Sequence, residues 1–563
     1  MIFRNILNKE FKVVLSAALT ISFFSLVAKL LGLVRNRIFA GEFGAGDTLD
    51  IYFAAFRIPD FLYNILIVGI LSSVFIPVFS EYLARDEQSA WKLANTVLSV
   101  FLLIFMAFCL VAIVFAPQLI TLVAVGFGDE KKQAAVELTR IMFLSPILLG
   151  ISNIIGNILQ VRKLFFSFAL APVMYNIGII LGALFFIKPL GVAGLAWGVV
   201  LGALLHLLIQ IPPLFKTGFV FRFLFDFTHA GLRKIVLLSL PRTVGLAAYQ
   251  LNFIIITSIA STMSSGSISV FNFANDLQFV PIGIVALSFV SAVFPMLSAA
   301  YANKDTGGFL RELYLTVNQI LFLVIPISLF LILERAQIVR VILGYGQFSW
   351  EDTRLTAAAL GAFAVSIFAQ SLIPLFTRAF YAIHNTKTPV FINVASVFIN
   401  ILFSFYFLNL MRAHGAFAHY VGTLLKVSDI ADISVLALPL AFSVSSIINF
   451  LWLYLAFSWR MESYDSDTII RSLFKTNIAV FVMAVAVYAT LHAVAALVDM
   501  QTFTGIFAQG IAAFLAGLLA YCASSWALKI PEFFTFWQAF FLPVRKLFLS
   551  RVFPIQVNGS DKL

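Results

Sequence analysis

The chain's fold is decided by the stretch Lys29 to Gly69, KLLGLVRNRIFAGEFGAGDTLDIYFAAFRIPDFLYNILIVG, because charged residues lie within or against its two long hydrophobic runs. A charge at bilayer depth costs about 2.5 kcal/mol or more, so it is tolerated mainly where it faces a bundle interior or a water-filled cavity. The stretch therefore predicts a helical hairpin with one polar face. The charged residues concerned are Lys29, Arg35, Arg37, Asp50, Arg57 and Asp60.

Helical geometry places some of these charges together. Asp50 and Arg57 share one face about two turns apart, and Arg57 and Asp60 are i,i+3 neighbours. This face is a candidate anion site whose cations are held by their own carboxylates, with Asp50 expected to hold Arg57. The alternative interpretation is a set of structural ion pairs between helices.

The composition indicates an all-α polytopic membrane protein. Of 563 residues, 61% are hydrophobic and 11% charged, against roughly 25% charged in a soluble domain. Apolar runs of about 20 residues can each cross a bilayer, and we count about fourteen. The expected spans are 14–34, 48–80, 93–116, 137–159, 165–187, 190–213, 234–260, 267–299, 310–333, 355–383, 388–410, 433–457, 474–498 and 503–528.

The ends and loops of the chain carry further signals. The first run follows a basic start but has no small-residue cleavage site, so we expect a retained helix. The loop from Arg412 to Ile433 is expected to hold a short surface helix, and the tail after Lys529 reads as an amphipathic interfacial segment. Cys109 and Cys522 lie far apart in apolar runs, which argues against a disulfide framework or a metal site.

The formal net charge of +11 is explained by topology. Most of the Lys and Arg residues fall in short loops on the N-terminal side of the membrane, so the positive-inside rule places both termini in the cytoplasm. We therefore expect no nucleic-acid partner.

An internal repeat links the two halves at a near-constant spacing of about 215 residues. Each match is weak, and the agreement of their spacings is what counts. The matched segments are 28–34 with 241–247, 75–80 with 293–298, 138–139 with 355–356, and 172–176 with 389–393.

Two six-helix halves in the same orientation imply a pseudo-two-fold axis along the membrane normal, with a site between the halves. Lys29 and Arg242 fall at equivalent positions and are expected to face each other across a central cavity. The alternative is that the Arg242 side chain extends from a helix kinked at Pro241 towards the membrane interface. The predicted domains are an N-lobe 1–220, a C-lobe 221–460, two extra helices 461–530 and a cytoplasmic tail 531–563.

The eighth predicted span, 267–299 (helix 8), has a second polar face, which carries Asn272, Asn275 and Asp276. Asp276 could pair with a cation, titrate or bind a cation, and the sequence does not choose among these. We include the three residues as cavity candidates.

Particular motifs resemble the MurJ/MviN lipid II flippase family of the multidrug/oligosaccharidyl-lipid/polysaccharide exporter superfamily. They are LLGLVR, FGAGDTLDIYFAAFRIPD, FIPVFSEY, LPRTVGLAAYQLN, GSISVFNFANDLQFVPIG and FYAIHNTKTPV. The resemblance covers essentially the whole chain. It implies a fourteen-helix transporter of the bacterial cytoplasmic membrane that moves an undecaprenyl-diphosphate-linked peptidoglycan precursor outward by alternating access. It also implies cavity cations that meet the diphosphate, and a groove for the lipid tail on helices 13 and 14.

The resemblance carries over to individual residues. Lys29, Arg35, Asp50 and Arg57 occupy the family's functional polar positions, with Lys29 where arginine is usual. Two departures from the family pattern make one wall of the expected cavity less cationic. Tyr63 stands where many members have arginine, and an Asp, Arg and Glu of helix 8 are replaced here by Asn275, Asp276 and Phe279.

No enzyme signature is present: there is no Walker loop, no HExxH and no Cys/His cluster. The six histidines, His206 among them, are scattered and expected to be packed or surface residues. We expect a monomeric transporter with a lipid-linked diphosphate sugar and membrane lipids as partners. No cofactor is expected except a coupling cation whose site the sequence does not locate, and the energy source stays open.

Two other functions are compatible with the sequence. One is an exporter of small cationic drugs or of another lipid-linked oligosaccharide on the same fold, although a drug exporter should have an acidic cavity. The other is a membrane glycosyltransferase or polymerase, which needs a catalytic carboxylate in a substantial outer loop. No such loop exists in the sequence.

The charge asymmetry predicts that the loop from Lys216 to Lys234 is cytoplasmic. A single cysteine placed in this loop, in a chain whose own two cysteines are replaced, should react with a membrane-impermeant maleimide only after the cells are opened. Labelling of this loop in intact cells would contradict the topology.

Overall fold

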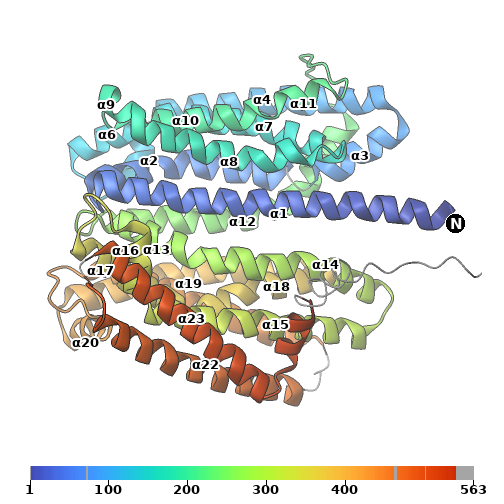
Figure 1. The fold of residues 1–563 in the computed structure, drawn as a ribbon. Coiled ribbons are helices and arrows are strands. Elements are labelled where there is room, and N and C mark those ends of the chain that lie inside the picture. The colour runs from blue at the N-terminus through green and yellow to red at the C-terminus, as the bar shows by residue number, and fades with distance from the viewer. Residues whose placement is uncertain (1, 72–73, 462–465, 501, 540–563) are drawn as a thin grey trace, which may run out of the picture. The chain divides into compact units, whose positions relative to one another are not determined.

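The structure is a computed structural model, shown in Figure 1. It describes residues 2–71, 74–461, 466–500 and 502–539, without the side chains of 2–18, 68–71, 240–242, 244–246 and 466–469. Throughout these residues the regular elements are helices and none is a strand. This agrees with the expectation for lipid, where a helix satisfies its own backbone hydrogen bonds.

The first half of the chain folds into long apolar helices joined by short turns. In order, the elements are α1 (Ile2–Phe43), α2 (Asp47–Tyr63), the π-helical η1 (Asn64–Leu71), α3 (Phe75–Arg85), α4 (Glu87–Val114), α5 (Ala116–Val123), α6 (Asp129–Met142), α7 (Leu144–Val161), α8 (Phe165–Leu181), the π-helical η2 (Gly182–Phe186), α9 (Ile187–Leu190), α10 (Ala193–Leu208) and α11 (Ile211–Phe215).

The second half has the same character. Its elements are α12 (Ala230–Ala260), α13 (Ser267–Pro281), the π-helical η3 (Ile282–Ala286), α14 (Leu287–Ala302), α15 (Thr306–Leu333), α16 (Arg335–Leu343), α17 (Trp350–Ala364), α18 (Ile367–Ala382), α19 (Lys387–Arg412), α20 (Ala416–Leu425), the 3-10 turn η4 (Ser434–Leu436), α21 (Ala437–Ser458), α22 (Ser466–Ala495) and α23 (Phe503–Ala527).

The predicted spans agree with these helices. Within the described residues, 11 helices are long and apolar enough to cross a membrane, or 12 if α17 and α18 are one span. The predicted spans 48–80 and 234–260 both include residues or side chains outside the described set. The short helix expected after Arg412 is α20, and the tail is helical over 531–539, while 540–563 lie outside the described residues.

Two boundaries differ from the sequence-based prediction. α1 does not end near residue 34 but continues to Phe43, where Gly44 adopts a left-handed φ of +63°. Arg35 is therefore a residue of the helix itself. The span predicted over 355–383 is two helices, α17 and α18, with a break at Val365 and Ser366.

Helix ends are marked by polar and basic residues. Asp86 and Asp305 cap α4 and α15 by accepting from Ser89 N and Gly308 N, at 2.7 and 2.8 Å. All the non-glycine residues with positive φ among the described residues are of basic types and follow a helix C-terminus. They are Lys163, Lys304, His384, His414, Lys426 and Lys529. The helix dipole favours a positive charge at this end of a helix.

By contact density, the chain divides into two compact units. The first comprises residues 1–280, 339–363 and 390–449, and the second comprises 281–338, 364–389 and 450–563. The predicted lobes 1–220 and 221–460, the helix pair 461–530 and the tail 531–563 stay a prediction.

Within the first unit, α8 packs along α10 with their backbones in contact (Figure 1). A Cβ at Gly202 would lie 2.4 Å from Tyr175 O of α8, and one at Gly198 would lie 3.2 Å from Ile179 O of α8 and 2.8 Å from Cα of Gly182, where η2 begins. Small residues spaced four apart allow such close approach of membrane helices. This contact fixes the position of the helix faces that carry Tyr175 and His206.

We predict that Gly198→Val separates α8 from α10, because overpacking a close contact costs about 1–3 kcal/mol. The thermal melting temperature of the purified protein in detergent should fall clearly. Gly128→Ala is the matched control, since a Cβ there meets nothing within 4 Å. Equal melting temperatures for both variants would contradict the close contact.

Candidate functional site

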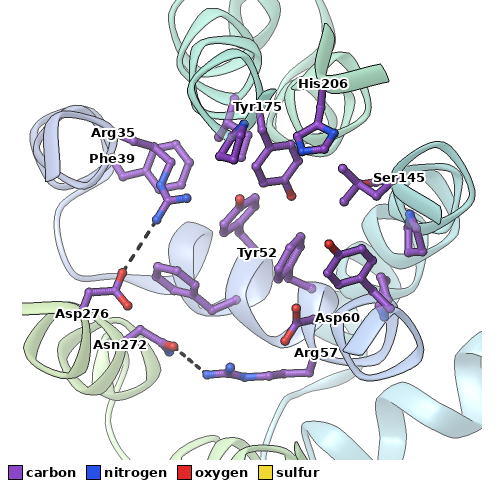
Figure 2. A pocket seen from close by; sticks show the side chains of 18 residues that line it. Arg35, Phe39, Tyr52, Arg57, Asp60, Ser145, Tyr175, His206, Asn272 and Asp276 are labelled. Atoms are coloured by element: carbon purple, nitrogen blue, oxygen red, sulfur yellow. Dashed lines mark hydrogen bonds and ion pairs between the residues drawn. The ribbon is translucent and has the colours of Figure 1, made fainter. Parts of the chain in front are cut away.

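A cavity of about 380 Å³ lies among α1, α2, α7, α8, α10 and α13, all within the first unit (Figure 2). Four of the sequence-predicted residues line it: Arg35, Arg57, Asn272 and Asp276. The structure therefore brings together residues from α1, α2 and α13 that are far apart in the sequence.

Arg35 is anchored at the cavity edge by a small polar cluster. Its guanidinium donates to Asn36 Oδ1 at 3.0 Å and to Asn176 Oδ1 at 3.4 Å, and it lies 3.8 Å from an Asp276 carboxylate oxygen. The buried Asn36 amide also donates to Asp276 at 2.9 Å. Of the roles left open for Asp276, the structure shows pairing with a cation.

Arg57 reaches from α2 to α12 and α13. It donates to Thr257 Oγ1 at 2.8 Å and to Asn272 Oδ1 at 2.6 Å, and its guanidinium lies 5.4 Å from the centre of the Phe253 ring. These oxygens are neutral, and among the described residues no carboxylate lies within ion-pair distance of Arg57. Neutral partners hold the guanidinium in place, and Asp60 and Asp276, which line the same cavity, act on its charge without forming an ion pair with it.

The predicted role of Asp50 in holding Arg57 is wrong. Asp50 is 4% exposed and its carboxylate accepts from Gly266 N at 2.8 Å, Ser269 N at 2.9 Å and Ser269 Oγ at 2.6 Å. These groups open the first turn of α13, where unpaired N–H groups and the helix dipole favour an anion. Asp50 thus caps a helix that begins more than 200 residues later.

The turn before α13 is built to approach α2 closely. Gly266 has a φ of +87°, and a Cβ there would lie 2.1 Å from Ala45 O, so only glycine fits. Asp47 accepts from Ser265 Oγ and from Lys131 Nζ, which lies 2.6 Å away. Together with Asp50, these contacts join the N-terminal ends of α2 and α13.

Of the other predicted site residues, Lys29 and Asn275 lie apart from the cavity. Lys29 is half-buried on α1 and is not among the lining residues. Asn275 accepts from Gln278 Nε2 at 3.1 Å on its own helix. Arg242 lies in α12, but its side chain falls outside the described residues, so its pairing with Lys29 across a cavity stays a prediction.

The sequence-based site also omitted a whole wall of the cavity. Tyr52, Ser145, Tyr175 and His206 line it from α2, α7, α8 and α10, and none of them was a candidate. Asp60 and Tyr63, both singled out in the sequence, also line the cavity, with Asp60 beside Arg57. One usable signal was proline within apolar runs, since Pro59, Pro146 and Pro172 also line the cavity. No group of three His, Cys, Asp or Glu side chains in the described part of the chain is placed to hold a metal ion.

Removing the Asp50 carboxylate should destabilise the protein, because a hydrogen bond to a charged group contributes about 1.5–3 kcal/mol. Asp50→Ala should lower the melting temperature and speed amide hydrogen exchange over residues 264–270. Asp50→Asn, which keeps one acceptor oxygen, should fall between it and the wild type. Asp129→Ala removes an exposed acid from the first turn of α6 and should change neither measurement; an equal effect in both variants would contradict the cap.

Comparison with known proteins gives this cavity a context. A family model described as "Lipid II flippase MurJ" matches residues 39–509. The chain is 28% identical over 408 residues to the lipid II flippase MurJ of Burkholderia cenocepacia, covering 71% of this chain and 79% of that protein.

Solved structures agree. The chain is similar, at 25% identity and a TM-score of 0.72, to a structure described as "Lipid II flippase MurJ, inward closed conformation", covering 90% of this chain and 97% of that one. It shares the fold of an inward-facing multidrug resistance MATE family transporter at 18% identity and a TM-score of 0.60, covering 77% and 95% of the two chains. The family model spans well over half of the sequence, and the chain therefore belongs to the MurJ family of lipid II flippases.

Proposed function

We propose that the chain moves lipid II, the undecaprenyl-diphosphate-linked peptidoglycan precursor, from the inner to the outer leaflet of the bacterial cytoplasmic membrane by alternating access. The proposal includes cytoplasmic termini, a monomeric transporter and no covalent chemistry. Family membership supports the substrate class, since relatives carry the name lipid II flippase.

The observation that carries the proposal is the pair of guanidinium groups on one cavity within apolar helices. Arg35 and Arg57 both line the cavity, and Arg57 is held by neutral oxygens alone among its described hydrogen-bond partners. A guanidinium matches phosphate oxygens with paired N–H donors. The lining also holds two carboxylates, Asp60 and Asp276, so the paired planar donors of the guanidinium groups, and not an excess of positive charge, favour a diphosphate over a cationic drug.

The cavity volume bears on how the substrate is held. At about 380 Å³ the cavity lies at the lower end of the range for small-molecule pockets, about 300–1,000 Å³. A diphosphate with one sugar fits such a volume, whereas a complete headgroup requires a wider state of the cavity. Lys29 lies about 9 Å along α1 from Arg35, and we propose that it meets the substrate in that wider state.

Movement in this proposal is driven by an ion gradient or by the gradient of the substrate itself. In the first case a coupling cation would be a second ligand. The proposal assigns no residues to it.

The test is complementation of a bacterium depleted of its own flippase, at matched expression. The wild-type chain should restore growth, and Arg35→Ala or Arg57→Ala should not. Binding of purified protein to lipid II should weaken roughly ten-fold or more for each variant, because each loses a charge-assisted contact of about 1.5–3 kcal/mol. Arg311→Ala, at an exposed arginine outside the cavity, is the matched control.

Two outcomes would contradict the proposal. If both cavity variants support growth as well as the wild type, these cations are structural. If the wild type fails while it binds the lipid-linked precursor of another polysaccharide, the substrate is a different lipid-linked sugar.

A further inference from the structure

His206 lines the cavity on the side opposite Arg57 (Figure 2). Its ring is fixed from behind by α7 and by the turn that follows α10. Nδ1 lies 2.7 Å from Ser152 Oγ, and Gln210 Nε2 donates to the same hydroxyl at 2.7 Å and to His206 O at 3.2 Å. Ser152 and Gln210 are both buried, so this support is internal to the protein.

Two placements of the hydrogens satisfy this cluster. Either Ser152 donates to Nδ1 and the ring carries its hydrogen on Nε2, or Nδ1 donates to Ser152, whose hydroxyl then donates to His206 O at 3.1 Å. In both placements Nδ1 is occupied. Nε2 has no partner among the described residues, so it is the ring nitrogen left for a ligand.

The surroundings of His206 are neutral and aromatic. The residues that α8 and α10 contribute to the cavity are Pro172, Tyr175, Ile179 and His206, and α7 contributes Ser145, Pro146 and Leu149. The charged lining residues in the described chain come instead from α1, α2 and α13. Figure 2 shows Tyr175, Ser145 and His206 on one side of the cavity and Arg57, Asn272 and Asp276 on the other. The cavity therefore has a charged wall and a neutral wall.

We propose that the neutral wall is the saccharide subsite of the lipid-linked substrate, with His206 Nε2 bonded to a sugar hydroxyl and the tyrosine rings against the sugar face. This rests on the proposed function, which places the diphosphate at Arg35 and Arg57. A sugar hydroxyl both donates and accepts, so it suits Nε2 in either hydrogen placement. A phosphate oxygen only accepts, and the neutral wall offers it no cation.

The wall is also pre-organised for such a ligand. The backbone contact of Gly202 with Tyr175 O fixes α8 against α10, and the Ser152 and Gln210 contacts hold the imidazole. A site that is built to bond a hydroxyl discriminates strongly against a ligand that lacks it. We therefore expect His206 to discriminate by sugar and not by lipid.

The test compares two ligands, lipid II and undecaprenyl diphosphate without sugar, on the full-length purified protein. His206→Phe should weaken lipid II binding about 5- to 10-fold, the loss of one or two neutral hydrogen bonds. Its affinity for undecaprenyl diphosphate should stay within about two-fold of the wild type. His206→Gln, which keeps a polar group, should recover part of the lipid II affinity, and His492→Phe, at an exposed histidine on α22, should match the wild type.

The variants separate this inference from the proposed function. Arg57→Ala should weaken both ligands, and if it weakens neither, the diphosphate site is wrong. If His206→Phe weakens both ligands equally, or neither, the saccharide subsite is wrong even where Arg57→Ala behaves as expected. A melting temperature for His206→Phe equal to the wild type shows that its lost binding does not reflect misfolding.

Discussion

Every charge among the apolar helices must be matched by hydrogen bonds or face water, and in the first unit this requirement determines how α2 meets α13. The Asp50 carboxylate is matched by the first-turn N–H groups of α13, and the Arg57 guanidinium by the Asn272 side-chain oxygen about one turn further along α13. Neither contact is an ion pair. Each side chain uses a neutral dipole of the neighbouring helix, so the N–H donors of Arg57 are held without an ion pair, although Asp60 and Asp276 line the same cavity.

The fold was largely predictable, because a bilayer leaves so few alternatives. Runs of about 20 apolar residues predict helices, and helices are found at the predicted spans. The end of α1 was missed because Arg35 and Arg37 interrupt the apolar run, although the helix ends only where Gly44 turns left-handed. The lobes and their two-fold relation rest on the repeat and stay a prediction.

The site was predictable only in its charged half. Arg35, Arg57 and Asp276 stand out as charges in apolar runs, but helical periodicity cannot say which neighbouring helix meets each side chain. For that reason Asp50 was paired with Arg57 on its own helix and not with the N-terminus of α13. His206 carries no such signal, because a single histidine in an apolar run differs little from a packed core residue until its neighbours Ser152 and Gln210 are known.

The glycine contact between α8 and α10 limits how this cavity can change shape. Where two backbones touch at Gly178 and Gly202, no side-chain layer remains to slide or to repack. We therefore expect α8 and α10 to move as one rigid body, together with Tyr175 and His206. α13 is joined to α2 by hydrogen bonds that water can replace, at Asp50, Asn272 and Thr257 of the adjoining α12. Parting of these polar contacts would release the Arg57 guanidinium on α2 from its present partners without disturbing the contact between α8 and α10.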